Sequence, residues 1–167
     1  MRWFYPLLAL LLTACGNKNV GETGPASAII RLTEADARGL DPQMVSDLAS
    51  TRIAADLFEG LTRFDAGGNA EAGLAETWET SADGRTWTFR LRPGLTFSDD
   101  RRLSADVFRR AFVRICDEQN GSPHGALFGI IESVATPDDR TIVIRLENPF
   151  PQLPALLAHP AMAALPF

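Results

Sequence analysis

The stretch that decides the fold, residues 53–98, reads IAADLFEGLTRFDAGGNAEAGLAETWETSADGRTWTFRLRPGLTFS. Around its start, residues 51–58 place apolar side chains near one face at helical spacing, which predicts a short amphipathic helix. A strand-like run over 61–64 follows, and the Asp, Gly and Asn residues of 65–69 predict the turn that ends it. The first half of the stretch is therefore a helix that leads directly into a strand.

A β-hairpin is the predicted structure of the second half. Trp78 lies in its first arm, and residues 82–84, Ala-Asp-Gly, favour a tight turn. In the second arm, over 86–91, apolar and polar side chains alternate, so one face of the strand is expected to be buried and to carry Trp87, Phe89 and Leu91. Arg-Pro-Gly at 92–94 ends the strand, because proline removes a backbone donor and glycine accepts turn dihedrals.

A longer helix is predicted over residues 104–117, where apolar side chains repeat at helical spacing. Ser104 is a suitable N-cap, and we expect the polar face to be solvated, including Arg109, Arg110 and Arg114. Alternating residues then predict two strands over 130–136 and 141–146, and 154–158 read as a short apolar helix.

The N-terminus has the pattern of a bacterial lipoprotein signal peptide, residues 1–15. Arg2 supplies a positive charge, and residues 7–12 form an apolar core too short to span a bilayer. Leu-Thr-Ala-Cys at 12–15 matches a lipobox, so Cys15 is the predicted lipid attachment site. The alternative is an ordinary secretory signal in which this cysteine occurs by chance.

The segment after Cys15 is polar and contains glycine, so residues 16–27 are expected to form a flexible tether. Residues 28–32 are the first strand candidate. With Cys15 modified, Cys116 has no partner for a disulfide within the chain, and we expect it to be a small buried apolar residue.

Composition narrows the functional classes. The chain has 167 residues, 46% of them hydrophobic, which is enough for one ordinary globular core. Its formal net charge is −5 and its arginines are scattered, so no nucleic-acid partner is expected.

An enzymatic function has little support in the residues. The aspartate pairs 99–100 and 138–139 lie in turn contexts, where aspartate is favoured for local hydrogen bonding. His124 and His159 are far apart in the sequence, and neither has a neighbouring acid or thiol that would mark a catalytic relay. We expect no enzyme, no cofactor and no metal, although joint metal ligation by the two histidines is a weak alternative.

Four motifs follow one another in a fixed order: DLFEGL at 56–61, GLAETWE at 73–79, DGRTWTF at 83–89 and LRPG at 91–94. Together they resemble the N-terminal part of the oligopeptide, dipeptide and nickel extracytoplasmic solute-binding proteins. Those proteins are the capture components of bacterial ATP-driven importers. The resemblance runs from about residue 40 to about residue 160.

The resemblance implies a mixed α/β (α+β) fold, the N-terminal part of a two-lobed periplasmic-binding-protein-like fold. Residues 28–167 would be the N-terminal portion of the solute-binding domain, with a small lobe over about residues 50–150 and a truncated C-terminus. We therefore expect the last segment to lack partners and to expose an apolar patch made of Leu153, Leu156, Leu157 and Met162.

The implied function is the capture of a short peptide, or a similar small solute, for import. Its partners would be the permease and ATPase subunits of the importer. The protein would lie in the periplasm or at the cell surface and would meet the membrane through its N-terminal lipid alone. The alternative is a lipoprotein that uses the same fold for sensing or surface interaction without transport, and a hydrolase is a third, weaker hypothesis.

The resemblance also suggests ligand-binding residues. His124 follows Ser-Pro where peptide-binding relatives carry a Ser-Pro-aromatic segment that faces the cleft. His159 lies in LLAHP, which matches a Leu-Leu-x-His-Pro segment near the cleft of some relatives. The residues after Leu-Asp-Pro at 40–42 would run beside the bound peptide: Ser46, Asp47 and Leu48. The alternative for each of these residues is an ordinary loop position.

The chain departs from the resembled family just before the long helix. Relatives usually have Ser-Asp-Gly-x-Pro there, whereas residues 98–102 read Ser-Asp-Asp-Arg-Arg. Aspartate tolerates a left-handed backbone conformation better than most residues, so we expect the turn to persist with some strain.

Overall fold

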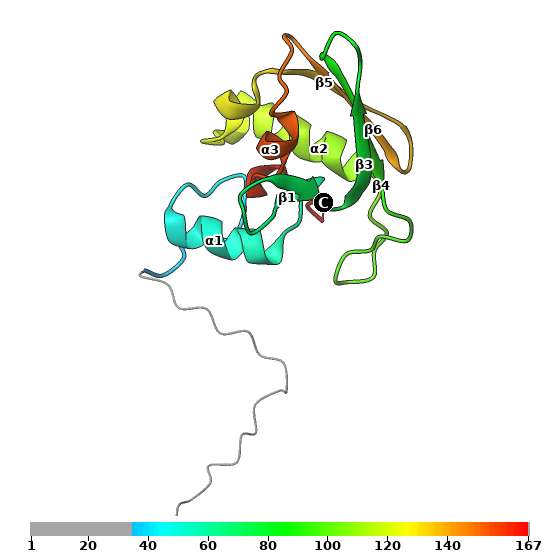
Figure 1. Cartoon of the computed structure of the whole chain (residues 1–167). Helices are drawn as coiled ribbons and strands as arrows, with labels where there is room; N and C mark the ends of the chain where they lie inside the picture. The colour runs from blue at the N-terminus through cyan, green and yellow to red at the C-terminus, as the bar shows by residue number, and fades with distance from the viewer. Residues whose placement is uncertain (1–34, 167) are drawn as a thin grey trace, which may run out of the picture. The chain divides into compact units, whose positions relative to one another are not determined.

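A four-stranded antiparallel sheet is the framework of the chain (Figure 1). The structure is a computed structural model that describes residues 35–166. The predicted signal peptide, tether and first strand lie outside the described residues. The strands, given in their order across the sheet, are β3 (Ala75–Thr80), β4 (Thr86–Leu91), β6 (Thr141–Leu146) and β5 (Ile131–Asp138).

The buried face of the sheet is built by the alternating residues of β4 and β6. Trp87 is paired with Ile144 and Phe89 with Ile142 in the antiparallel register, so these four side chains form two adjacent cross-strand pairs. Phe89 and Ile142 are fully buried, and Trp87 is 7% exposed. Apolar cross-strand pairs of this kind stabilise a sheet, and the predicted hairpin and its buried face are confirmed.

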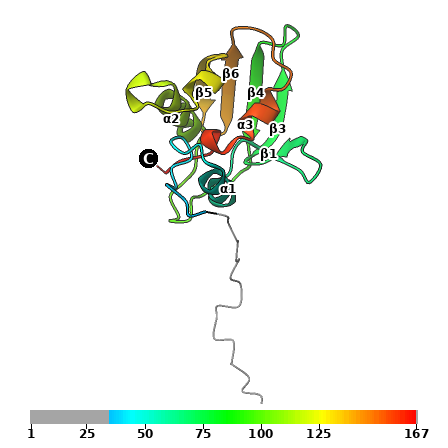
Figure 2. The ribbon, with the colours of Figure 1, turned by 90° about the vertical axis from the view of Figure 1, so that its left-hand side faces the viewer.

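Helix α2 (Ala105–Cys116) covers this face of the sheet and packs against β5 and β6. Figures 1 and 2 show α2 on the same side of the sheet as α3 (Leu153–Leu157). Ser104 precedes α2 as predicted, but its side chain makes no capping hydrogen bond. Asp106 in the first turn forms ion pairs with Arg109 and Arg110. The apolar face predicted for this helix is buried at Val107, Phe108, Ala111 and Ile115.

A second, smaller sheet contacts the helix α3 near the C-terminal end of the described residues. It consists of β1 (Thr62–Phe64) and β2 (Ala70–Ala72). The hydroxyl of Thr62, which is fully buried, donates to the carbonyl oxygen of Pro154 in α3 over 2.6 Å. A Cβ atom on Gly60 would lie 2.7 Å from the carbonyl oxygen of Leu157, so this close approach requires glycine.

Helix α1 (Leu48–Leu57) begins three residues earlier than the predicted helix. Asp47 is its N-cap, and the carboxylate accepts a hydrogen bond from the backbone N–H of Ser50 over 2.9 Å. The apolar pattern could not reveal the first residues of the helix, because they do not continue its buried face. Leu48, the first of them, is 61% exposed. The cap rather than the apolar pattern therefore sets the start of the helix. None of the helices within residues 35–166 is long and apolar enough to cross a membrane.

Two predictions about burial are wrong. Leu153 and Leu157 are fully buried and Met162 is 2% exposed, so the expected apolar patch does not exist. The 3-10 helix η3 (Pro160–Met162) and the residues after it pack into the core, and Ala164 donates its N–H to the carbonyl oxygen of Glu59. Cys116 is exposed rather than buried, although partial burial raises the pKa of its thiol.

The turn before α2 has the backbone that we expected. Asp100 has a φ of 65°, and it is the only residue other than glycine with positive φ among the described residues. The turn is closed by a hydrogen bond from the N–H of Phe97 to the carbonyl oxygen of Arg101. Asp100 therefore occupies the position where glycine is the favoured residue, and the persistence of the turn is confirmed.

Replacing Asp100 should test this strain directly. We expect Asp100→Gly to stabilise the protein by up to about 1 kcal/mol, because glycine adopts positive φ without a steric penalty. The matched variant Asp100→Val should destabilise it by about 1–2 kcal/mol, because a β-branched residue is disfavoured there. Urea unfolding measures both changes. Equal unfolding free energies for the two variants would show that the turn is not strained.

Candidate functional site

The fold brings the two histidines of the chain into contact. Their ring centroids lie 4.9 Å apart, and the ring planes are tilted by 57°. His124 belongs to the segment after α2, directly before the 3-10 helix η2 (Gly125–Phe128), and His159 precedes η3. Both residues are ligand-binding candidates from the sequence, where the resemblance placed both near the cleft but did not predict contact between their rings. We define them as the histidine pair.

His124 is held by a backbone carbonyl. Its Nε2 lies 2.7 Å from the carbonyl oxygen of Val45, and its backbone N–H donates to the hydroxyl of Ser122 over 3.2 Å. A carbonyl oxygen can only accept, so Nε2 of His124 carries the hydrogen in this contact. In the neutral imidazole, Nδ1 is then a hydrogen-bond acceptor.

His159 has the opposite arrangement. Its Nδ1 accepts a hydrogen bond from the backbone N–H of Ala161 over 3.1 Å, so the ring caps η3. The hydrogen of the neutral ring therefore lies on Nε2, which is a donor. Burial, together with the neighbouring His124, lowers the pKa of His159 and favours this neutral form.

The remaining ring nitrogens of the pair are accessible to solvent. Among the described residues, the only buried side-chain nitrogen or oxygen atom without a hydrogen-bond partner is Nε1 of Trp87. Nδ1 of His124 and Nε2 of His159 are therefore not enclosed in the protein. When both rings are neutral, the two remaining nitrogens are one acceptor, on His124, and one donor, on His159.

The buried amide of Gln43 holds the surroundings of the pair together. Its side chain is fully buried, and its Nε2 donates to the carbonyl oxygens of Ala111 in α2 and Ala161 in η3 over 2.8 and 3.2 Å. The hydroxyl of Ser122 donates to the backbone carbonyl oxygen of Gln43 over 2.6 Å. One residue thus connects the segments that carry Val45, His124 and His159.

An ion pair supports the same connection. The guanidinium of Arg114 donates to both carboxylate oxygens of Asp41 and to Oε1 of Gln43. The hydrogen bond from Arg114 lowers the pKa of Asp41. The prediction that Arg114 lies on a solvated face is therefore wrong. The sequence could not reveal this, because no pattern in it indicates that α2 meets the segment around Asp41.

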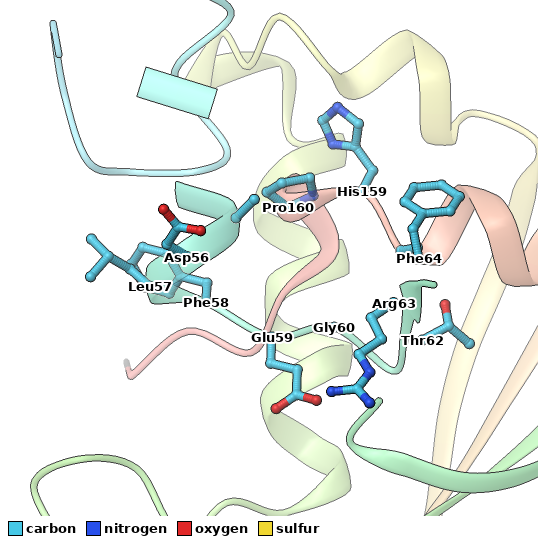
Figure 3. A pocket seen from close by; sticks show the side chains of 12 residues that line it. Asp56, Leu57, Phe58, Glu59, Gly60, Thr62, Arg63, Phe64, His159 and Pro160 are labelled. Carbon is cyan, nitrogen blue, oxygen red and sulfur yellow. The ribbon is translucent and has the colours of Figure 1, made fainter. Parts of the chain in front are cut away.

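A cavity of about 580 Å³ lies beside His159 (Figure 3). It is lined by residues 55–60 and 62–64, which end α1 and form β1, and by residues 158–160. Leu57 and Phe64 contribute exposed apolar side chains, and Glu59 and Arg63 contribute charges. Arg63 also forms an ion pair with Glu71 over 2.8 Å. Apart from His159, none of the lining residues was predicted from the sequence as a site residue.

Of the other three candidates, Ser46, Asp47 and Leu48, only Ser46 adjoins a residue that contacts the histidine pair. Asp47 and Leu48 line a separate hollow of about 180 Å³. The carboxylate of Asp47 is engaged as the cap of α1, and its hydrogen bonds with Ser50 lower the pKa of Asp47. Ser46 is exposed and follows Val45, the residue that contacts His124.

The described residues show no arrangement typical of a metal centre. Within residues 35–166, no group of three or more histidine, cysteine or acidic side chains could hold a metal ion. The histidine pair is also poorly suited to bind a metal ion. Nδ1 of His159 already accepts a hydrogen bond from the N–H of Ala161, and Nε2 of His159 carries the hydrogen.

The chain matches a protein-family model over residues 69–166, that of the bacterial extracellular solute-binding proteins, family 5. It is 30% identical to the periplasmic oligopeptide-binding protein OppA of Escherichia coli over 155 residues, 83% of the chain. It is 28% identical to the dipeptide-binding protein of Lactococcus lactis over 92% of the chain. The chain spans 28% and 30% of the length of these two relatives.

Solved structures show the same fold. OppA of Haemophilus influenzae, solved in complex with the peptide RPPGFSPFR, is 28% identical and superimposes with a TM-score of 0.75. This match covers 79% of the chain and 29% of that protein. The mixed α/β fold class of a periplasmic-binding-protein-like lobe is thereby confirmed. The chain belongs to the bacterial extracellular solute-binding proteins of family 5.

Proposed function

We propose that the chain is part of a protein that captures short peptides, or similar small solutes, for import by an ATP-driven transporter. The observation that carries this proposal is the family membership together with the names of its relatives, which include oligopeptide- and dipeptide-binding proteins. These relatives are solute-binding proteins and not enzymes. No covalent step is part of the proposed function.

The histidine pair supports peptide capture locally. It offers a donor and an acceptor, and one of its members, His159, lines a cavity that also has apolar and charged side chains. Hydrogen bonds to a peptide backbone would hold solutes with different side chains, as strand addition does. The proposed partners are therefore a peptide, and the permease and ATPase subunits that receive it.

The proposed location is the periplasm or the cell surface, with Cys15 as the lipid attachment site. The lipobox at 12–15 and the polar segment after it support this proposal. Lipid on an N-terminal cysteine provides more than one acyl chain, and a single chain would anchor the protein only weakly. The anchor would keep the protein close to its permease.

Metabolic labelling tests the anchor. A palmitate analogue should label the chain expressed in a bacterial host, and Cys15→Ala should abolish the label because the acceptor thiol is removed. Cys116→Ala is the matched control and should keep it. Equal labelling of the chain and Cys15→Ala would contradict lipidation at this residue.

A second function is sensing without transport. One solved structure with the same fold is the pheromone receptor PrgZ, which is 27% identical and superimposes with a TM-score of 0.75. Both functions use peptide capture and differ in the step after capture. Permease and ATPase genes beside the gene for this chain would favour transport.

Peptide binding itself is tested by titration. In a protein that contains this chain together with the rest of the solute-binding domain, we expect tetraalanine to cause saturable shifts in the imidazole NMR signals of His124 and His159, because these rings would hydrogen-bond its backbone. Glucose is the control solute and should leave these signals unchanged. Imidazole signals that do not respond to any peptide of two to five residues would contradict the proposed function.

A further inference from the structure

His159 fixes the short helix η3 through a ring nitrogen that must carry no hydrogen. Its Nδ1 accepts a hydrogen bond from the backbone N–H of Ala161 over 3.1 Å. A neutral imidazole provides this acceptor, whereas an imidazolium carries a donor on both ring nitrogens. The hydrogen bond therefore exists only while His159 is neutral.

The residues that depend on this hydrogen bond are buried. Ala161 is fully buried, so its N–H would be left without a partner if the imidazole turned away. The carbonyl oxygen of Ala161 accepts from Nε2 of Gln43, and the N–H of Ala164 donates to the carbonyl oxygen of Glu59. Loss of the cap would therefore weaken η3 together with its connections to the rest of the core.

His124 gives a second reason why a proton on His159 is disfavoured. The ring centroids lie 4.9 Å apart, so two positive charges would be close together. A proton on His124 alone breaks no contact, because its Nε2 donates to the carbonyl oxygen of Val45 in both forms of the ring. The two histidines therefore differ, since only protonation of His159 removes a hydrogen bond.

We propose that the hydrogen bond between His159 and Ala161 is an acid-sensitive latch, which holds η3 while His159 is neutral and releases it when the ring is protonated. The latch consists of these two residues. This inference goes beyond the proposed function and does not depend on it, because the latch acts on the fold and not on a solute. Its failure would leave the proposed function untouched.

The surroundings of the latch favour its closed form. The charged side chains around it line the cavity or join α2 to the segment before α1: Asp56, Glu59, Arg63, Arg114 and Asp41. Figure 3 shows the ring of His159 pointing away from Glu59 and Arg63. Burial, followed by the nearby His124, lowers the pKa of His159. Both causes favour the neutral ring.

The direction of the pH dependence follows from the lowered pKa. In the unfolded chain His159 takes up its proton at the ordinary pKa of 6.5, and in the folded chain it does so only at lower pH. The stability that the latch provides is therefore complete above the unfolded pKa and is lost as the pH falls toward the folded one. Carboxyl groups titrate near about pH 4, so a comparison of pH 7.5 with pH 5.5 isolates the histidines.

Urea unfolding of the 167-residue chain at these two pH values tests the latch. We expect the equilibrium constant for unfolding to rise roughly 3- to 10-fold at pH 5.5, because unfolding then binds about one proton. His159→Asn is the matched variant and should show no such rise, since its side-chain oxygen still accepts from the N–H of Ala161 but does not titrate in this range. His124→Gln removes the other titrating ring and should still show the rise.

Three outcomes of the unfolding experiment would overturn the inference. These are equal unfolding constants at both pH values for the unsubstituted chain, an undiminished rise in His159→Asn, and the absence of a rise in His124→Gln.

An NMR titration of the unsubstituted chain provides a second measurement that needs no variant. The imidazole signal of His159 should give a pKa below 6.5, and the amide signal of Ala161 should change with the same midpoint, because its hydrogen-bond acceptor is lost there. A pKa of His159 at or above 6.5, or an Ala161 amide signal that does not follow the titration, would also overturn the latch.

Discussion

The buried side chain of Gln43 joins parts of the protein that are far apart in the sequence, and the arrangement of the site depends on it. Its amide donates to carbonyl oxygens of α2 and η3, and its Oε1 accepts from Arg114. A buried amide without these partners would cost the protein free energy, so the three segments are fixed together. Val45 and Ala161, which orient the two histidines, lie on the segments that Gln43 connects.

The central sheet could be predicted from the sequence because a strand with one buried face has a period of two residues. The alternation over 86–91 identified the buried face correctly at Phe89, and the alternation over 141–146 predicted the strand that contains Ile142. The turn at Asp100 could also be predicted, since its backbone conformation depends on local sterics. These features are determined by neighbouring residues along the chain, which is the information that a single sequence contains.

Features that depend on distant partners could not be predicted. Nothing in the sequence indicates that Arg114 meets Asp41 or that the rings of His124 and His159 touch. The apolar residues near the end of the chain were expected to be exposed, on the assumption that their partners lie elsewhere. Instead they pack into the same core as α2 and the sheet, and Leu157 is fully buried. The resemblance identified the histidines as candidates, and the structure adds their relative geometry.

Gln43→Leu tests most directly whether the buried amide of Gln43 holds the site together. Leucine fills a similar volume but cannot satisfy the carbonyl oxygens of Ala111 and Ala161, so we expect a loss of about 2–3 kcal/mol in unfolding free energy. The nuclear Overhauser contacts between the two imidazole rings should weaken at the same time, whereas Met44→Leu, a change at the exposed neighbouring residue, should preserve them. Unchanged stability and unchanged ring contacts in Gln43→Leu would contradict the account.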